Sequence, residues 1–489
     1  ILIQYPGARV LAATTTNFDE QTSRREFLNK AAIGDYDIIL MRYSHYKMIS
    51  LSPTVQSEFL RERMVQYREA LDRITATEEA NSRAEGKKRK STTRAEKSLQ
   101  KSLMRMSERL NQLMSMKRDT GFPYFDEMGF DQIFVDAADN FKNLDFASAV
   151  QNVLGMGSPA GAEQALDMHM KVQFTQRQGG GVVFATGTPI SNTLAEAFHM
   201  MRYLQPEELE KLNLGCFDEW QRMYAEQVTQ WELNASGTGL KQRTRFSKFH
   251  NVQELSKILR KTWDVMTAEM LEDRGILRKG HELPLVKREI IESNVTPLLT
   301  EYLDHLGDRE REMEHRKGPP QKGEDIHLVV ISHGKLASID MRLIHPSLPD
   351  EQGSKLNRTI DKAYSNYKDN PGTAGVIFYD MTRPRKKGEL MFDVYAEIKK
   401  KLVAKGVPAK EIAFIHDFNT DAKKLQLFSD VNNARVRILI GNTQKLGAGT
   451  NVQHKLKWLI HVDGPTRPRD VIQREGRIIR QGNENKEVL

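Results

Sequence analysis

The segment Val471-Ile-Gln-Arg-Glu-Gly-Arg-Ile-Ile-Arg-Gln-Gly-Asn483 sets glutamine, glycine and arginine at short, fixed intervals. Its Arg477 and Arg480 are three residues apart, so on a helix they project from the same face. Two guanidinium groups so arranged can hold the terminal phosphate of a nucleotide on a facing domain and stabilise the charge that develops in phosphoryl transfer. The alternative is a solvated basic helix, because arginine is mostly exposed in proteins.

Around this segment, short apolar runs alternate with helical stretches, which predicts an α/β protein with parallel sheets covered by helices. The runs that read as buried strands are 9–13, 37–41, 132–135 and 181–185 in one group, and 375–379, 412–415, 436–440 and 458–462 in another. Two α/β domains are therefore expected, at 1–206 and 351–489. The intervening residues 207–350 read as mainly helical.

An insertion at 53–117 interrupts the first of these domains. Its apolar residues follow heptad spacing twice, at Leu60, Met64, Tyr67, Leu71 and Ile74, and again at Leu99, Leu103, Met106, Leu110 and Leu113. Two matched stripes predict an antiparallel coiled-coil hairpin. The connecting tip contains Lys87, Lys88, Arg89 and Lys90, which fit either a solvated turn or a binding role.

Composition sets limits on the class of protein. At 489 residues the chain is too long for one core, and no run approaches the roughly 18 apolar residues of a membrane span. The net charge of +8 permits a polyanionic partner without establishing one. The single Cys216 excludes a disulfide framework and suits a reducing cytoplasm. Because the chain opens on Ile1 rather than methionine, it is expected to be part of a longer polypeptide.

Several segments together resemble the Swi/Snf-type superfamily-two DNA translocases. Ala185-Thr-Gly-Thr-Pro-Ile-Ser-Asn192 resembles motif III and Lys445-Leu-Gly-Ala-Gly-Thr-Asn451 resembles motif V, while the Val471 segment has the Q-x-x-G-R-x-x-R-x-G spacing of motif VI. Further pieces are similar to helicase modules of large phage, plasmid and conjugative-element proteins, often fused to adenine-specific DNA methyltransferases. These are Tyr36-Asp-Ile-Ile, Phe141-Lys-Asn-Leu144, Phe414-Ile-His-Asp417 and Thr443-Gln-Lys. Within the Swi/Snf-type resemblance, Leu283-Pro-Leu-Val-Lys287 is similar to the link into the second motor domain, and Gly353-Ser-Lys-Leu356 is similar to the helix that opens that domain.

The resemblance implies two RecA-like domains that bind ATP and magnesium between them and duplex DNA without regard to sequence. It assigns the finger arginines Arg477 and Arg480 with Gln473 to catalysis, Asp136 to magnesium, and Gly447, Gly449 and Gly476 to nucleotide binding. Thr186, Gly187 and Thr188 would couple nucleotide to DNA. The residues implied to contact the DNA backbone are Thr14, Thr15, Ser44, His45, Thr443, Gln444 and Lys445. A Ser44–His45 hydrolase is disfavoured because no G-x-S-x-G elbow surrounds the serine.

Two departures from the family pattern bear on activity. No G-x-x-x-x-G-K-[ST] phosphate loop occurs in the 489 residues. The D-E-A-H box reads Asp136-Ala-Ala-Asp139, so Ala137 replaces the glutamate that orients the attacking water and Asp139 replaces the coupling histidine. Losing a catalytic base costs on the order of 10²–10⁴-fold in rate.

The expected function is an ATP-dependent double-stranded DNA translocase module of a larger phage or mobile-element protein, acting in the bacterial cytoplasm beside other domains of the same polypeptide. The alternative is a pseudo-ATPase that binds DNA or serves assembly. The segment Lys241-Gln-Arg-Thr-Arg-Phe-Ser-Lys-Phe249 interleaves basic and aromatic residues. It fits either a nucleic-acid contact or a helix that packs its phenylalanines inward.

Overall fold

The protein is described by a computed structural model. It describes residues 3–14, 16–84, 94–115, 121–148, 150, 153–154, 156, 159–190, 193, 195–233, 240–276, 283–316, 318, 320–384, 391–446, 451–465 and 467–489. The chain divides into two compact units: residues 1–231 with 242–264 form the first, and residues 232–241 with 265–489 form the second. No described helix has the length and hydropathy needed to cross a bilayer.

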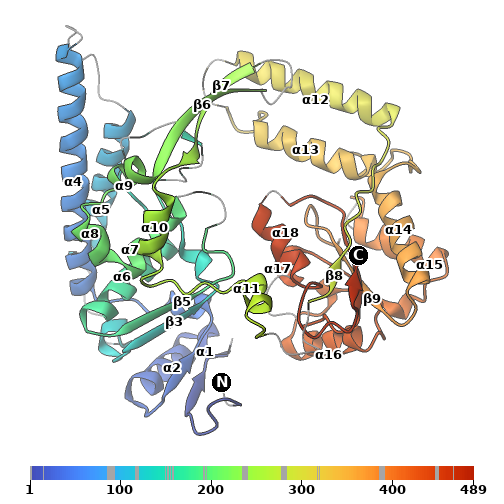
Figure 1. The fold of residues 1–489 in the computed structure, drawn as a ribbon, viewed down its shortest axis with the longest axis horizontal. Coiled ribbons are helices and arrows are strands. Elements are labelled where there is room, and N and C mark those ends of the chain that lie inside the picture. Colours follow the sequence, from blue (N-terminus) through green and yellow to red (C-terminus); the bar gives the residue numbers. More distant parts are fainter. Residues whose placement is uncertain are drawn as a thin grey trace. The chain divides into compact units, whose positions relative to one another are not determined.

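The first unit contains two parallel strand pairs, β1 with β2 and β3 with β5, and the second pair is labelled in Figure 1. The strands are β1 (Val10–Ala12), β2 (Ile38–Leu40), β3 (Gln132–Asp136) and β5 (Gly181–Ala185). The helices that accompany them are α1 (Thr16–Asp19), α2 (Gln21–Ile33), α3 (Tyr43–Tyr46), η1 (Phe125–Glu127), η2 (Ala138–Phe141), α6 (Glu163–Arg177) and α7 (Ala195–Leu204). The structure confirms the four strands that the sequence predicts for the first domain, but not their full burial: β3 alternates between buried and exposed residues, and no residue of β1, β2 or β5 is buried.

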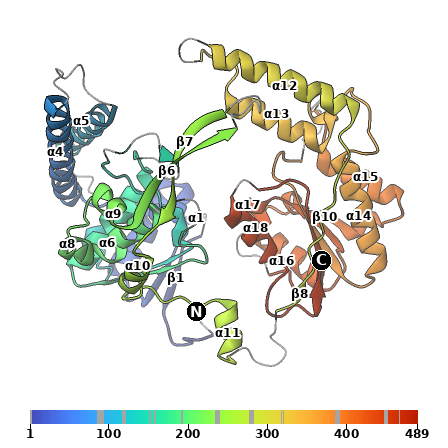
Figure 2. The same ribbon diagram turned by 45° about the horizontal axis from the view of Figure 1, so that its top comes forward.

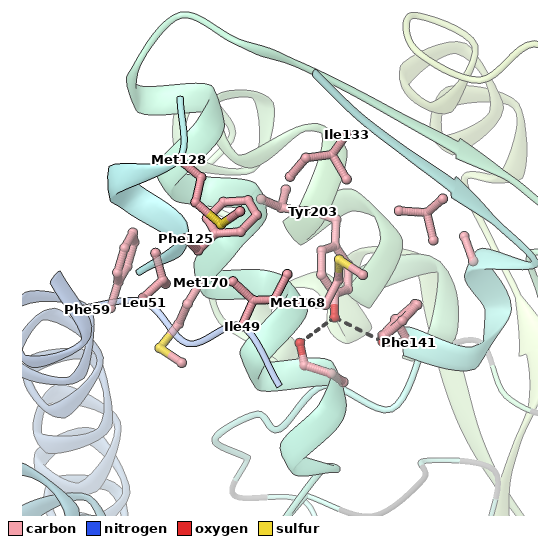
Figure 3. Close-up of a cluster of buried hydrophobic side chains, with 14 of the residues drawn as sticks. Ile49, Leu51, Phe59, Phe125, Met128, Ile133, Phe141, Met168, Met170 and Tyr203 are labelled. Carbon is pink, nitrogen blue, oxygen red and sulfur yellow. Dashed lines mark hydrogen bonds between the residues drawn. The ribbon is translucent and has the colours of Figure 1, made fainter. Parts of the chain in front are cut away.

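Tyr203 lies at the centre of the first unit's core (Figure 3). Its hydroxyl donates to the carbonyl oxygens of Phe141, at 3.1 Å, and Ala165, at 2.7 Å, so a fully buried phenol is satisfied by backbone. Ile133 and Val135 of β3 face this core, whereas Phe134 between them is 75% exposed. Burial alternates along β3 because successive side chains of a strand point to opposite faces of the sheet.

The predicted helical insertion is present as α4 (Pro53–Ala84) and α5 (Arg94–Ser115), which pack side by side (Figure 2). Tyr67 and Ile74 of α4 bury themselves against Leu99 of α5, as the heptad stripes predict. Thr75 also donates to Glu96 at 2.9 Å. The supercoiling of a coiled coil stays a prediction, and the basic tip Lys87, Lys88, Arg89 and Lys90 lies outside the described residues.

Residues beyond 206 also contribute to the first unit. Phe198 of α7 packs with Phe217 and Trp220 of α9 and with Leu255 of α10 in one buried cluster. The helices here are α8 (Pro206–Lys211), α9 (Phe217–Tyr224) and α10 (Val252–Leu259), and a three-stranded sheet contains β4 (Val153–Leu154), β6 (Ala225–Leu233) and β7 (Leu240–Phe249). The alternative of a helix at 241–249 is therefore wrong. The segment is a strand because it pairs with β6 on one side and β4 on the other. Side chains alternate between the two faces of a strand, and Phe246 lies on the face that contacts the Phe217 ring.

The second unit is built on a parallel sheet of order β10-β11-β9-β12. The strands are β8 (Leu285–Val286), β9 (Ala374–Phe378), β10 (Ile412–Phe414), β11 (Ile438–Gly441), β12 (Leu456–His461) and β13 (Glu487–Val488). The helices are α11 (Ala268–Asp273), α12 (Pro297–His315), α13 (His327–Ile339), η3 (Met341–Leu343), α14 (Lys355–Asp369), α15 (Val394–Ala404), η4 (Ala409–Glu411), η5 (Ile415–Asp417), α16 (Asp421–Asn432), α17 (Thr443–Leu446) and α18 (Pro468–Glu475).

Helices cover both faces of this sheet. One face of the strands packs on α14 and α15, and the other face packs on α16. All of β9 is buried, as expected for a central parallel strand. A Cβ at Gly375 would lie 2.0 Å from the Trp458 indole, so only glycine lets the ring rest on the strand. The predicted strands of the second domain are confirmed, and Ser354 caps α14 where the sequence predicts its start.

Candidate functional site

Three polar residues follow neighbouring strands of the second unit: Asp380 after β9, Thr443 after β11 and Asp463 after β12. Because carboxyl ends of parallel strands meet at one edge of a sheet, these side chains are brought together. Asp380 accepts from the amide and the hydroxyl of Thr443, both at 2.6 Å. The Asp380 amide donates to Asp463 at 2.8 Å.

Arg474 of α18 joins this group at its centre, with 0% of its side chain exposed. Its guanidinium pairs with Asp380 at 2.8 Å and Asp463 at 3.1 Å, and its Nε donates to the Thr443 hydroxyl at 2.7 Å. Its Nη1 also donates to the Asp463 carbonyl oxygen, at 3.0 Å, and lies 3.2 Å from Nδ1 of His461. We call these residues the Arg474 cluster: Asp380, Thr443, His461, Asp463 and Arg474.

Burial and neighbouring charges shift the pKa values of the titratable groups in the Arg474 cluster in different directions. Burial favours the neutral form of Asp380, but the hydrogen bonds from Thr443 and the Arg474 charge outweigh it and lower the pKa of that carboxyl. Deeper burial raises the pKa of Asp463 despite Arg474. Burial and the nearby guanidinium lower the pKa of His461, which keeps its imidazole neutral. The cluster thus holds one permanent cation against two carboxylates.

Arg477 and Arg480 do not lie on a helix, which corrects the sequence prediction. Helix α18 ends at Glu475, and the Arg477 amide donates to the Arg474 carbonyl oxygen in a tighter turn at 3.1 Å. Gly476 at the C-cap ends the regular helix before either arginine. Burial, followed by the Arg480 charge, lowers the pKa of the Arg477 guanidinium. Gln473, on the last turn of α18, is half-buried.

The residues predicted to bind DNA from the second unit have different surroundings. Thr443 is 9% exposed, and its hydroxyl is engaged by Asp380 and Arg474, so its structural contacts lie within the Arg474 cluster. Gln444 is exposed, and the Lys445 ammonium lies 3.3 Å from the Asn419 side-chain oxygen. The predicted nucleotide-binding Gly447 and Gly449 lie outside the described residues.

In the first unit, Asp136 closes β3 with an exposed carboxylate, and Asp139 two residues beyond Ala137 is 3% exposed. Ala137 between them has a left-handed φ of 52°, which turns the chain sharply after the strand. Thr186 donates from its hydroxyl to Asp139 at 3.0 Å and accepts from the Thr188 amide at 3.1 Å. The aspartate that replaces the family's histidine therefore contacts the predicted coupling segment directly.

Asp136 and Asp139 also act on Tyr43 of α3. Burial, followed by the charges of these two carboxylates, raises the pKa of the Tyr43 phenol to about 12. Asp136 can supply one magnesium ligand, which fits an ion held mostly by nucleotide phosphates and water. No group of three or more histidine, cysteine or carboxylate side chains that could hold a metal by itself occurs among the described residues.

The remaining predicted DNA contacts of the first unit divide by exposure. Thr14 is exposed, and its amide and hydroxyl bond to the Asn17 side-chain oxygen at 2.8 and 2.6 Å. Ser44 is exposed on α3, whereas His45 is 4% exposed and stacks on Phe18 at a ring separation of 4.3 Å. The structure gives His45 a packing role, and its DNA contact stays a prediction. Thr15 lies outside the described residues.

Sequence reasoning missed Arg474, the most buried member of its own motif. The sequence does contain a signal for this role. Aspartates directly follow the predicted strands at 375–379 and 458–462, and carboxylates buried at strand ends require a nearby cation.

Comparisons with known proteins agree with this arrangement of segments. A family model described as a probable helicase domain matches residues 2–267, more than half of the chain, and one described as the helicase conserved C-terminal domain matches residues 356–482. The chain is also similar to the defense against restriction protein B of Escherichia phage P1, at 26% identity over 171 residues. That match covers 33% of this chain and 8% of the phage protein. The chain therefore belongs to the probable helicase domain family.

Proposed function

We propose that the chain is the motor module of an ATP-dependent translocase on double-stranded DNA, within a larger phage or mobile-element protein. The observation that carries this proposal is the Arg474 cluster. It ties the turn that bears Arg477 and Arg480 to the carboxyl ends of β9, β11 and β12. An arginine finger has to be held rigidly to act at a transferring phosphoryl group, because its effect depends on position.

In this proposal each unit supplies part of the chemistry. Asp136 would hold the magnesium ion, which neutralises phosphate charge when it is bound. Arg477 and Arg480 would approach the phosphates of bound ATP. Thr186 would report the state of the nucleotide site through Asp139, to which it donates. Ser44, Gln444 and Lys445, which are not buried, would contact the phosphates of DNA.

The second candidate is a pseudo-ATPase that binds DNA or serves assembly, and Ala137 favours it. A methyl group cannot orient the attacking water, so hydrolysis in the natural sequence is expected to be slow. Ala137 already carries a Cβ at a φ of 52°, so a longer side chain adds no new backbone strain there. Restoring glutamate is therefore a fair test of the chemistry.

The test compares ATP hydrolysis by the natural polypeptide that carries these residues with that of its Ala137→Glu and Ala137→Glu/Asp139→His variants, with and without duplex DNA. A gain on the order of 10²-fold with Ala137→Glu is expected. The double variant also restores the family's coupling histidine at position 139, so its comparison with Ala137→Glu measures what that histidine adds to stimulation by DNA. Triplex-displacement assays then separate a translocase from an ATPase that stays in place. If duplex DNA stimulates ATP hydrolysis in none of these variants, the translocase proposal is contradicted and the assembly module is the function that is left.

DNA binding is tested separately by its salt dependence. Binding should be indifferent to sequence and fall steeply with salt, because neutralised phosphates release counterions. Lys445→Ala should weaken binding to all sequences alike and reduce the salt slope by about one ion. Lys400→Ala on α15, whose side chain is 79% exposed, is the matched control. A strong preference for one sequence at constant salt would contradict this part of the proposal.

A further inference from the structure

The first unit has a half-open cavity of about 530 Å³ beside α4, within the size range of small-molecule sites. Its lining comes from α4, α6, α7, α8 and α9, all of them labelled in Figure 1. We call it the α4 cavity. None of the residues predicted to bind nucleotide, magnesium or DNA lines it.

The floor of the α4 cavity holds two arginines but only one nearby carboxylate. Both carboxylate oxygens of Asp145 accept from Arg63, one of them at 2.9 Å, and one also accepts from the Tyr67 hydroxyl at 2.8 Å. Arg202 reaches only the main-chain oxygen of Asp145, at 2.6 Å. The side-chain hydrogen bonds of Asp145 go to Arg63 and Tyr67, while its charge acts on both guanidinium groups, so two cations at the floor share one carboxylate.

Arg202 shows the effect of this imbalance. Burial and the neighbouring Arg63 charge lower the pKa of the Arg202 guanidinium to about 10. Within the part of the chain that the structure describes, its guanidinium has no hydrogen-bond acceptor besides Asp145, and the side chain lines the cavity. Arg202 is partly buried. A guanidinium whose remaining donors meet no acceptor among the described residues can take an anion, because a carboxylate fits its fork in a bidentate pair.

The walls and the mouth of the cavity limit which anion fits. The buried rings of Phe146, Phe198 and Phe217 line it, which suits an apolar body. At the mouth, Glu69 and Glu210 are exposed and form no ion pair with a described residue. These two carboxylates repel a multiply charged ligand more than a singly charged one.

The other charges at the mouth do not cancel this repulsion, because they pair with one another. Arg177 pairs with Glu62 at 2.7 Å, and Arg73 pairs with Glu219 at 2.5 Å. The cavity therefore has excess positive charge at its floor, phenylalanine rings on part of its wall and negative charge at its mouth.

We propose that the α4 cavity binds a small monocarboxylate with an apolar body, whose carboxylate pairs with Arg202. The site is separate from the proposed motor chemistry and does not depend on it. The apolar body would lie against the phenylalanine rings, and the single negative charge would meet the Arg202 guanidinium at the floor.

Isothermal titration of the chain with sodium benzoate, benzamide and inorganic phosphate tests this proposal. Benzoate should bind with one saturable site. Benzamide has the same shape without the charge and should bind roughly tenfold more weakly or worse, since charged hydrogen bonds are the stronger ones. Phosphate should bind more weakly than benzoate. Absence of saturable benzoate binding, or equal binding of benzoate and benzamide, would overturn the proposal.

Variants locate the site. Arg202→Met should abolish the preference for benzoate over benzamide, while Arg177→Met, which removes an already paired guanidinium at the mouth, should keep it. Glu210→Gln should strengthen benzoate binding about two- to fivefold and leave benzamide unchanged, as removal of one exposed charge implies. This variant decides the matter if Arg202→Met fails to fold. Unchanged benzoate affinity in Glu210→Gln, or a retained preference in folded Arg202→Met, would refute the assignment.

Discussion

At the scale of single residues, the buried guanidinium of Arg474 joins segments that are far apart in the chain. Asp380 precedes Arg474 by almost a hundred positions, yet their charged groups lie 2.8 Å apart. Buried charges are tolerated only when they are paired and hydrogen-bonded, and Arg474 meets both conditions through Asp463 and Thr443. The position of the Arg477–Arg480 turn therefore depends on the buried pairing of Arg474, which directly precedes that turn.

Replacing Arg474 should destabilise the second unit and displace that turn. Arg474→Met would leave the buried carboxylate of Asp463 without its cation, at a cost of roughly 3–5 kcal/mol in the free energy of unfolding. Urea denaturation followed by tryptophan fluorescence measures this. Arg467→Met, at an exposed position just before α18, should change stability by less than about 0.5 kcal/mol. Equal effects of the two substitutions would show that the cluster contributes little.

A second prediction at this scale concerns the contact between Asp139 and Thr186. Thr186→Val removes the hydroxyl that donates to a buried carboxylate at 3.0 Å and should cost about 1–3 kcal/mol. A double-mutant cycle with Asp139→Ala should give a coupling energy of at least about 0.5 kcal/mol. Thr188→Val, which keeps the donated amide, is the control. Additive effects of Thr186→Val and Asp139→Ala would mean that the two segments are energetically independent.

At the scale of elements, α4 combines two roles. Its amino-terminal half packs into the body of the first unit, where Phe59 joins the main core and Arg63 holds Asp145. Farther along, Ile74 packs on Leu99 of α5. A helix of 32 residues rises about 1.5 Å per residue, so its far end lies well beyond the core that anchors it.

Removing residues 76–97 and closing the hairpin with a short turn should leave the first unit folded, because its core residues lie outside this range. Circular dichroism and the urea midpoint measure folding, and DNA titration at several salt concentrations measures binding. A smaller salt slope would assign the basic tip to DNA, and an unchanged slope would leave it as a solvated turn. Loss of cooperative unfolding would show instead that the hairpin is part of the core.

At the scale of the whole molecule, the two units differ in how their sheets are covered. The central strand β9 of the second unit is buried throughout. In the first unit, Phe134 of β3 and Val183 of β5 are 75% and 47% exposed. Burial of apolar area is the main driving force for folding, so the second unit is expected to be the more stable of the two.

Acid should destabilise the first unit through Asp145. Burial opposes the ionised form of this carboxyl, but Arg63 and Arg202 outweigh it and lower its pKa. Since the folded pKa lies below the unfolded value, the stabilisation is present above about pH 4 and is lost as pH falls through the folded pKa. Asp145→Asn should lower the urea midpoint at pH 7, and its difference from the natural chain should shrink toward pH 3. Asp304→Asn, at an exposed position, should leave the pH profile unchanged.

The sequence by itself determined the strands and the helical hairpin of this protein. Short apolar runs and heptad stripes act through local geometry, and the structure confirms β3, β9 and the pairing of Tyr67 and Ile74 with Leu99. The sequence motifs also indicated a helicase-type protein, and the two helicase family matches agree with that. These features depend on neighbours along the chain, which the sequence displays directly.

Only the tertiary structure decided how the individual functional side chains are used. It ended α18 before Arg477, made a strand of 240–249, and buried His45 against Phe18. It also brought Arg474 to Asp380 and placed both Arg63 and Arg202 beside the single carboxylate of Asp145. Each outcome depends on desolvation and pairing between groups distant in sequence. The sequence gives the type of each charged residue. Its pairing partner and its burial, which set its pKa and its contacts, are properties of the folded chain.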